Sequence, residues 1–427
     1  MAFSRRRFLT VAGVTAGTAL AQPLQQFHQR ASLAQPLQGQ GYGPLVKDPR
    51  GLLDLPKGFQ YRAFSRTGER MTDGNLVPAD HDGMAAFPGP NNTTILVRNH
   101  ELSPDETPAA VGPRYDAACA GGTTTLVLNA DRRLLQHYVS LAGTYRNCAG
   151  GATPWGSWIS CEENTSTPAT EPTLSRRHGY NFEVPALATE PVVPEPLVAM
   201  GRFYHEAIAV DPSTGIVYQT EDRGDGLFYR FIPTEPGNLK ARGVLEALKI
   251  KGKPQAITKT GFAMGEPMAV EWVRIEDPDP MDDTVRKEGF TAGAAQFSRG
   301  EGLCFDGKDL YICCTNGGEA GMGQVWRYQP AKNGGQLSLF VESSGRSHLD
   351  YPDNITASSF GDLFISEDGW GEQFVRGIQR NGQIYDFARN ALNTSELAGI
   401  CFATNPLTMF VNIQTPGITF AIWGPFV

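Results

Sequence analysis

Acidic side chains recur at matching places in several copies of one short sequence pattern. In the clearest copy, Glu301 precedes an apolar run, a glycine turn follows at Gly307, and a second apolar run ends near Thr315. Two strands joined by a tight turn bring their outer ends to the same side of a sheet. We therefore expect the residue before the first strand and the residues after the second strand to share one edge. Carboxylates at that edge could bind hard cations, which prefer oxygen ligands.

The other copies place chemically similar residues at the same two positions. A further strand pair follows most copies, and the units beginning at residues 301, 353 and 398 are 52 and 45 residues apart. The stretch 249–291, rich in proline and charge, is predicted to be an insertion between two units. The acids expected before a first strand are Asp82, Glu206, Glu301 and Asp353. The residues expected after a second strand are Glu101, Cys161, Glu162, Glu221 and Glu367.

Repeats of about four strands at this spacing are typical of a β-propeller, whose first strands line a central channel. The sequence therefore predicts an all-β fold, a six-bladed β-propeller with a central metal-binding channel. The acids of different blades would then meet at one channel mouth. Crowded carboxylates repel one another and are costly to remove from water unless a cation offsets their charge. The alternative is that each acidic pair is an ordinary turn facing water.

Cys161 would add a soft ligand to this ring of acids. The copy of the repeat that contains it is degenerate and starts at Gly150; Cys161 follows Trp155-Gly-Ser-Trp158 and stands beside Glu162 and Glu163. Calcium does not favour a thiolate, so this position indicates a transition metal such as iron or zinc. The alternative is a buried structural cysteine. The chain has seven cysteines, an odd number, and a disulfide between Cys119 and Cys148 is a further option.

Arg299 lies two residues before Glu301, so both side chains could reach one cleft. A guanidinium does not bind a metal ion, but it binds phosphate through paired hydrogen bonds. His205 could hold or orient a metal ligand, and Arg223 is a second candidate for an anion. A surface arginine and a structural histidine are the simpler interpretations of these residues.

The N-terminus has the features of an export signal. Arg5-Arg-Arg-Phe-Leu9 precedes a short apolar run that ends in Ala19-Leu-Ala21, as in a twin-arginine signal peptide. We expect residues 1–21 to be removed, residues 22–45 to be a linker, and residues 46–427 to form one domain. The expected partner during export is the twin-arginine translocon, and the expected location is periplasmic or extracellular, with no membrane attachment after cleavage.

Composition excludes some partners. The net charge is −8 over 427 residues, whereas nucleic-acid binding needs lysine and arginine to neutralise phosphates. We expect no nucleic-acid partner, a small-molecule substrate and a monomeric chain.

Several of these stretches together resemble the PhoX family of exported alkaline phosphatases. The resemblance covers most of the chain after the signal. The segments that carry it are Thr153-Pro-Trp-Gly-Ser-Trp-Ile-Ser-Cys-Glu-Glu-Asn164, Tyr204-His-Glu206, Arg299-Gly-Glu-Gly302, Asp353-Asn-Ile-Thr356 and Val411-Asn-Ile-Gln-Thr-Pro-Gly417.

The resemblance implies a six-bladed propeller that holds Fe³⁺ and Ca²⁺ with a bridging oxo group and hydrolyses phosphate monoesters at alkaline pH. It implies that Cys161 is the thiolate ligand of iron and that Glu206 and Glu301 are carboxylate ligands. It further implies that Arg299 holds the phosphate, and it extends to Asp353 and Glu367 as metal ligands. Glu101 and Glu162 complete the predicted metal-binding set by their place in the repeat.

Two other functions fit the repeat without the cysteine. One is a calcium-dependent propeller hydrolase of the lactonase or phosphotriesterase type, whose site uses carboxylates and Asn. The other is a non-catalytic propeller that calcium stabilises and that serves as a binding module. Iron bound alongside calcium would favour the phosphatase over both.

Overall fold

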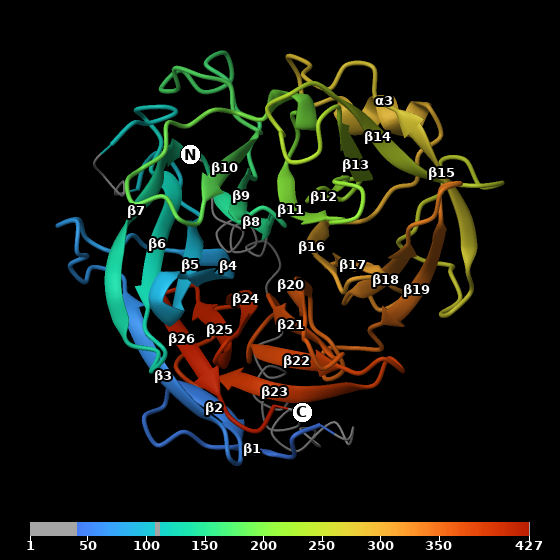
Figure 1. The fold of residues 1–427 in the computed structure, drawn as a ribbon. Helices are drawn as coiled ribbons and strands as arrows, with labels where there is room; N and C mark the ends of the chain where they lie inside the picture. Colours follow the sequence, from blue (N-terminus) through green and yellow to red (C-terminus); the bar gives the residue numbers. More distant parts are fainter. Residues whose placement is uncertain (1–40, 107–111, 427) are drawn as a thin grey trace, which may run out of the picture. The chain divides into compact units, whose positions relative to one another are not determined.

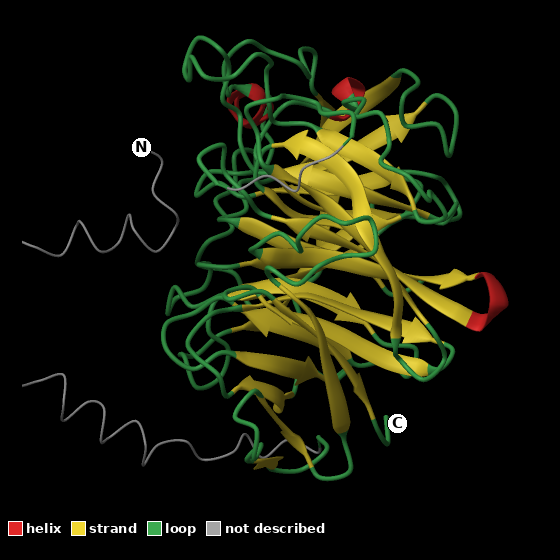
Figure 2. Cartoon of the chain, turned by 90° about the vertical axis from the view of Figure 1, so that its left-hand side faces the viewer, coloured by secondary structure: helices red, strands yellow, loops and turns green. Residues whose placement is uncertain are grey.

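Short antiparallel strands account for nearly all regular structure in the described part of this protein. The structure is a computed structural model that describes residues 41–106 and 112–426. The predicted signal peptide and most of the predicted linker lie outside these residues. No helix within them is long and apolar enough to cross a membrane. The strands gather into groups arranged in a ring in Figure 1, and in Figure 2 loops join them at both ends.

Blades 1 to 3 follow one another in chain order. Blade 1 contains β4 (His81–Gly89), β5 (Thr93–His100), β6 (Gly121–Leu128) and β7 (Leu134–Thr144). Blade 2 contains β8 (Asn147–Ala152), β9 (Ser157–Glu162) and β10 (Asn181–Pro185). Blade 3 contains β11 (His205–Val210), β12 (Val217–Glu221), β13 (Phe228–Pro233), β14 (Gly243–Ile250) and β15 (Met268–Arg274).

Blades 4 to 6 complete the ring. Blade 4 contains β16 (Gly300–Phe305), β17 (Leu310–Cys314), β18 (Gln324–Gln329) and β19 (Gln336–Glu342). Blade 5 contains β20 (Pro352–Ala357), β21 (Leu363–Glu367), β22 (Phe374–Ile378) and β23 (Ile384–Asn390), extended at its edge by β2 (Leu53–Pro56) and β1 (Leu45–Val46). Blade 6 contains β24 (Leu397–Thr404), β25 (Leu407–Ile413), β26 (Ile418–Trp423) and β3 (Gln60–Arg66).

The six first strands, β4, β8, β11, β16, β20 and β24, are neighbours in this order, and β24 lies beside β4 again. This arrangement confirms the predicted six-bladed propeller within the described residues. Blades 3 and 4 are also joined at their outer edges by two residue pairs, Met268 with Leu337 and Ala269 with Gln336. Clusters of buried apolar side chains fill the spaces around the blades, such as Leu303, Ile312 and Trp326.

The last blade is completed by a strand from the beginning of the chain. β3 pairs antiparallel with β26, from Gln60 opposite Trp423 to Arg66 opposite Ile418. No local sequence pattern predicts this closure, because the two paired segments lie at opposite ends of the described chain. The folded part also begins before the expected boundary at residue 46, because the Tyr42 ring contacts the Phe59 and Phe387 rings.

The predicted insertion at residues 249–291 is only partly irregular. It contains β15, which adds a fifth strand to blade 3, and the short helix α3 (Val285–Thr291). Two single 3₁₀ turns, η1 (Pro90–Asn92) and η2 (Val198–Met200), occur elsewhere. Blade 2 begins at Asn147, three residues before the start at Gly150 that the sequence analysis assigns to it.

All six first strands share an irregularity at the same place. The register with the second strand shifts within the first few residues, as between His81 and Met84 or between Gly300 and Leu303. Corresponding shifts occur in β8, β11, β20 and β24. Such β-bulges re-aim side chains and are frequent beside active sites. The bulge therefore turns one residue per blade away from the regular ladder.

Candidate metal centre

Each bulge places one residue directly after the first paired position of its strand. In blade order these residues are Asp82, Cys148, Glu206, Glu301, Asp353 and Gly399. Four of the six are the acids that the sequence analysis expects before a first strand. The blade 2 residue is a cysteine, and the blade 6 residue is a glycine. All five side chains that carry a functional group are buried.

The blade 2, 3 and 4 residues meet in one cluster of potential ligands. Atoms of Cys148, Glu163 and Glu206 lie within 4.8 Å of one another, and so do atoms of Glu206, Asp222 and Glu301. Glu206 belongs to both groups, so the five residues form one continuous set. We call this set the metal centre. Burial, followed by the charges of Glu206 and Glu163, raises the pKa of the Cys148 thiol well above its ordinary value.

The thiol that lies among these potential ligands is that of Cys148 and not that of the predicted Cys161. The Cys161 side chain lies in an apolar cluster with Ile159 and Leu197, and no group of potential metal ligands among the described residues includes it. The sequence analysis starts blade 2 at Gly150, which leaves Cys148 outside the repeat. With β8 beginning at Asn147, Cys148 occupies the position of the acids in blades 1, 3, 4 and 5.

Glu162 is buried next to the metal centre but is held by other groups. Its carboxylate accepts hydrogen bonds from the backbone N–H groups of Tyr145, Gly179 and Tyr180 at 2.9, 2.9 and 3.2 Å. A His178 ring nitrogen lies 2.7 Å from its Oε1 atom. Four partners therefore surround this carboxylate, and it belongs to none of the potential metal-binding groups of the described residues.

Arg299 contacts two acids of the metal centre. Its Nε donates to Asp222 Oδ1 at 2.9 Å, and its Nη2 donates to Glu301 Oε1 at 2.6 Å. On the blade 2 side, Arg146 donates to Glu163 Oε2 at 2.8 Å and to Glu101 Oε1 at 2.5 Å. The two arginine side chains are 22% and 21% exposed, so each guanidinium lies between the buried acids and the solvent.

The two arginines occupy equivalent places in their blades. Arg299 stands two residues before Glu301, and Arg146 stands two residues before Cys148. Both have a left-handed backbone with φ of +51°, and the backbone is also left-handed at the corresponding positions of blades 1 and 5, Asp80 (φ +45°) and Tyr351 (φ +57°). Such a backbone is uncommon for residues other than glycine and clusters at functional sites. In blades 2 and 4 this turn accompanies an arginine whose guanidinium contacts the buried acids.

A second group of acids brings together blades 1, 5 and 6. Burial raises the pKa of Glu396 well above its ordinary value, and the charges of Asp368, Asp353 and Asp82 raise it further. At the edge of the same group, burial and the charges of Glu106 and Glu101 raise the pKa of Asp80 to about 7. Asp353 and Asp82 are therefore close enough to other acids to interact, as the sequence analysis expects.

Glu221 and Glu367 are both buried and hold structural partners. The Tyr229 hydroxyl donates to Glu221 at 2.7 Å, and Arg376 Nε donates to Glu367 at 2.8 Å. Burial raises the pKa of each carboxyl to about 7. His205 lies on the Phe203 ring, and one of its ring nitrogens is 3.0 Å from the Gly201 carbonyl oxygen. His205 belongs to none of the groups of potential metal ligands among the described residues.

The donors present suit two kinds of cation. The metal centre offers one thiol and four carboxylates, and this set fits a transition metal because sulfur is a soft ligand. The group around Glu396 offers oxygen atoms alone, which suits Ca²⁺. Cations would also offset the repulsion between acids that burial makes costly. The predicted iron and calcium therefore match the chemistry of these residues.

Several residues of the site are missed by the sequence analysis, and some signals for them are present in the sequence. Cys148 can be identified from the repeat by its spacing from an arginine: Arg146 stands two residues before it, as Arg299 stands two residues before Glu301. Glu163 and Asp222 each come directly after the acid that ends a second strand. All seven cysteines are free, so the considered disulfide between Cys119 and Cys148 is wrong.

Comparison with solved structures supports the fold. The structure is similar to Pseudomonas fluorescens PhoX in complex with vanadate, a transition state analogue, with a TM-score of 0.70 and 18% identity over 90% of this chain and 97% of that chain. A gluconolactonase from Xanthomonas campestris, XC5397, matches with a TM-score of 0.40 and 13% identity over 90% of this chain and 98% of that chain. No curated protein sequence matches the chain.

The family is shown by the sequence itself. The model of the family described as alkaline phosphatase PhoX matches residues 40–417, which include every blade residue at the channel mouth and both arginines. Together with the six-bladed ring and the buried acids, this match shows that the chain belongs to the PhoX family of alkaline phosphatases.

Proposed function

We propose that this protein hydrolyses small phosphate monoesters with a mixed cluster of metal ions at the channel mouth. The observation that carries the proposal is the set of Cys148, Glu163, Glu206, Asp222 and Glu301, brought together from three blades under two arginines. Cys148 and the acids around it would hold iron, and the oxygen-only group around Glu396 would hold calcium. When bound, the metals supply Lewis-acid stabilisation of the charge on the phosphoryl group.

The protein's own groups bind and orient the substrate. Arg299 and Arg146 each present a partly exposed guanidinium at the rim of the buried acids. In the described structure these guanidiniums offset carboxylate charge. Once cations take over that task, the guanidiniums can turn to phosphoryl oxygens and form paired hydrogen bonds. Fixed cationic groups of this kind stabilise charge that develops in the transition state.

The chemistry of the donor set also decides against the alternatives. A lactonase-type calcium site needs no thiol, and a calcium-stabilised binding module needs neither the thiol nor the arginines. Here the thiol occupies a repeat position that other blades fill with acids, which favours the phosphatase. In this proposal Cys148 replaces Cys161 as the thiolate ligand. The predicted ligands Glu206, Glu301 and Asp353 remain metal ligands. Three other predicted ligands instead support the site from around it: Glu101, Glu162 and Glu367.

The test is turnover of p-nitrophenyl phosphate by protein purified after export. We expect hydrolysis at alkaline pH, loss of activity after chelation, and its return when iron and calcium are added together. Elemental analysis of the active protein should find both metals. Protein that contains both metals and releases no phosphate would contradict the proposal. We further propose export by the twin-arginine route, since a chain that binds iron in the cytoplasm gains from transport in the folded state.

A further inference from the structure

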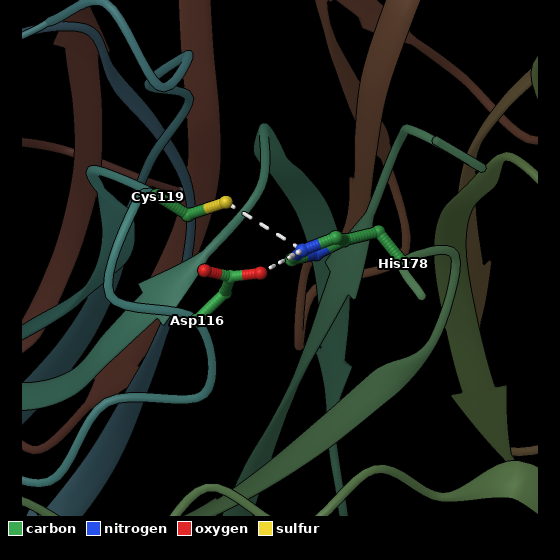
Figure 3. Close-up of side chains that lie close together, drawn as sticks. All are labelled: Asp116, Cys119 and His178. Carbon is green, nitrogen blue, oxygen red and sulfur yellow. Dashed lines mark hydrogen bonds and ion pairs between the residues drawn. The ribbon is translucent and has the colours of Figure 1, made fainter. Parts of the chain in front are cut away.

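A second set of potential metal ligands lies apart from the metal centre. Asp116 and Cys119 come from the loop between β5 and β6, and His178 comes from the loop between β9 and β10. In Figure 3 the Cys119 sulfur and the Asp116 carboxylate both point toward the His178 ring. The three side chains are at most 1% exposed. None of the three belongs to the metal centre.

The distances within this set are those of ligands around one tetrahedral ion. Cys119 Sγ lies 3.5 Å from His178 Nε2, and Asp116 Oδ2 lies 3.6 Å from the same nitrogen. Bonds of about 2.3 Å from zinc to sulfur and about 2.0 Å to nitrogen, at a tetrahedral angle, separate the two ligand atoms by about 3.5 Å. The same geometry separates nitrogen and oxygen ligands by about 3.3 Å. The two distances to His178 Nε2 therefore match tetrahedral zinc to within about 0.3 Å.

The opposite side of the histidine ring supplies independent support. His178 Nδ1 lies 2.7 Å from Glu162 Oε1, and the backbone N–H groups of Tyr145 and Gly179 fix that carboxylate. With its proton on Nδ1 donated to Glu162, the imidazole presents the Nε2 lone pair to Cys119 and Asp116. A carboxylate behind a histidine is the usual support of a zinc ligand, because it sets the tautomer and the ring orientation.

The Asp116 carboxylate is fixed in the same way. It accepts hydrogen bonds from the backbone N–H groups of Ala118, Ser175 and Arg176 at 3.0, 2.7 and 2.9 Å. These bonds also tie the loop that carries Asp116 to the loop that carries His178.

We propose that Asp116, Cys119 and His178 bind one Zn²⁺ ion. The thiolate and the imidazole are ligands that calcium does not favour and zinc does. The ion joins the loop before β6 to the loop before β10 and, through His178, holds Glu162 in place at the end of β9. Because Glu163 follows directly, this tie fixes the strand end that carries one acid of the metal centre. The proposal does not depend on phosphatase activity.

Cobalt spectroscopy on the full exported chain tests this site. Cys148→Ser removes the thiol of the metal centre. Any sulfur-to-cobalt charge-transfer band of this variant must therefore come from another cysteine. We expect the metal-stripped Cys148→Ser protein to bind Co²⁺ with a thiolate band, and Zn²⁺ to displace it. The band should vanish when Cys119→Ser is added and persist with Cys313→Ser, which changes a buried thiol outside every potential metal-binding group of the described residues.

The test does not require a fragile variant. A Cys148→Ser protein without a thiolate band overturns the proposal with all three proposed ligands intact, and a band that survives Cys119→Ser overturns it as well. Absence of the band would leave a metal-free thiol–imidazole hydrogen bond as the explanation of the 3.5 Å contact. Zinc analysis of the native protein gives a second readout, with one ion per chain expected and none after His178→Gln.

Discussion

A single thiol distinguishes the metal centre from an ordinary ring of acids. Cys148 stands where blades 1, 3, 4 and 5 each place a carboxylate, and it lies close to Glu163 and Glu206. A carboxylate there would give an all-oxygen site suited to calcium. On the proposal made above, the cysteine would give this side of the channel a preference for a softer ion. The identity of one residue would then divide a ring that otherwise offers carboxylates into two kinds of site.

Cys148→Ser tests this division, with Cys161→Ser as the matched control. Both thiols are buried in blade 2 and thirteen residues apart, but only Cys148 is near the acids. We expect Cys148→Ser to lose iron and to lower kcat by more than the roughly 10–100-fold that a supporting residue costs. Cys161→Ser should keep both metals, as measured by elemental analysis. Iron loss from the control alone would restore the assignment made from the sequence.

Arg299→Gln tests the arginine that contacts Asp222 and Glu301. Removing a fixed cationic group from the site should lower kcat/KM by roughly 10²–10³-fold, while calcium and iron contents stay unchanged. Arg389→Gln is the control, because Arg389 is paired with Asp54 at the outer edge of blade 5. Equal effects of the two changes on p-nitrophenyl phosphate turnover would show that Arg299 acts through stability alone.

At the scale of the element, the bulged first strand positions the site. In blades 1 to 5 it sets one functional side chain apart from the regular ladder while the rest of the strand stays in its sheet. It also brings neighbouring blades very close together. A Cβ atom on Gly302 would lie 2.3 Å from the Asp353 carbonyl oxygen of the next blade. The close packing of β16 against β20 therefore requires a glycine at position 302.

Gly302→Ala should be destabilising because the atom it meets belongs to the backbone and cannot rotate away. Overpacking of this kind costs about 1–3 kcal/mol, and the shift between blades should also weaken metal binding by Glu301. Gly224→Ala is the control, since no atom lies within 4 Å of its added Cβ. Urea unfolding of both proteins measures the difference. Equal midpoints would show that the blades can separate at no cost.

The sequence predicts the repeated element better than its exact limits. Alternating apolar runs and glycine turns identify most first and second strands, and the acids Glu206 and Glu301 stand where the repeat places them. Blade 2 is misplaced by three residues because its first strand, Asn147–Ala152, consists mostly of small residues and lacks an apolar run. That small error transfers the thiol from Cys148 to Cys161. Closure by β3 is missed because pairing between distant segments leaves no local pattern.

At the scale of the whole molecule, buried acids make stability depend on pH. Burial raises the pKa of Glu221 and of Glu367 to about 7, above the ordinary value of 4.5. The folded state therefore holds protons on these groups that the unfolded state has released. Their contribution to stability is fully present below about pH 4.5 and is lost as the pH rises through about 7.

We accordingly expect the melting temperature of metal-stripped protein to fall between pH 5 and pH 8. Added iron and calcium should reverse most of the loss at pH 8, because cations favour the charged form of the neighbouring acids. Glu367→Gln, which removes one titrating group, should make the fall shallower in the stripped protein. Differential scanning calorimetry at several pH values measures all three. A melting temperature that rises with pH in stripped protein would refute this account.

The pairing of β3 with β26 has a consequence for biosynthesis. The outer strand of blade 6, residues 60–66, can pair only after residues 418–423 have been synthesised. Until these two distant segments meet, the ring stays open between blade 6 and blade 1. Assembly of a complete metal cluster across blades 1, 5 and 6 must therefore follow this pairing.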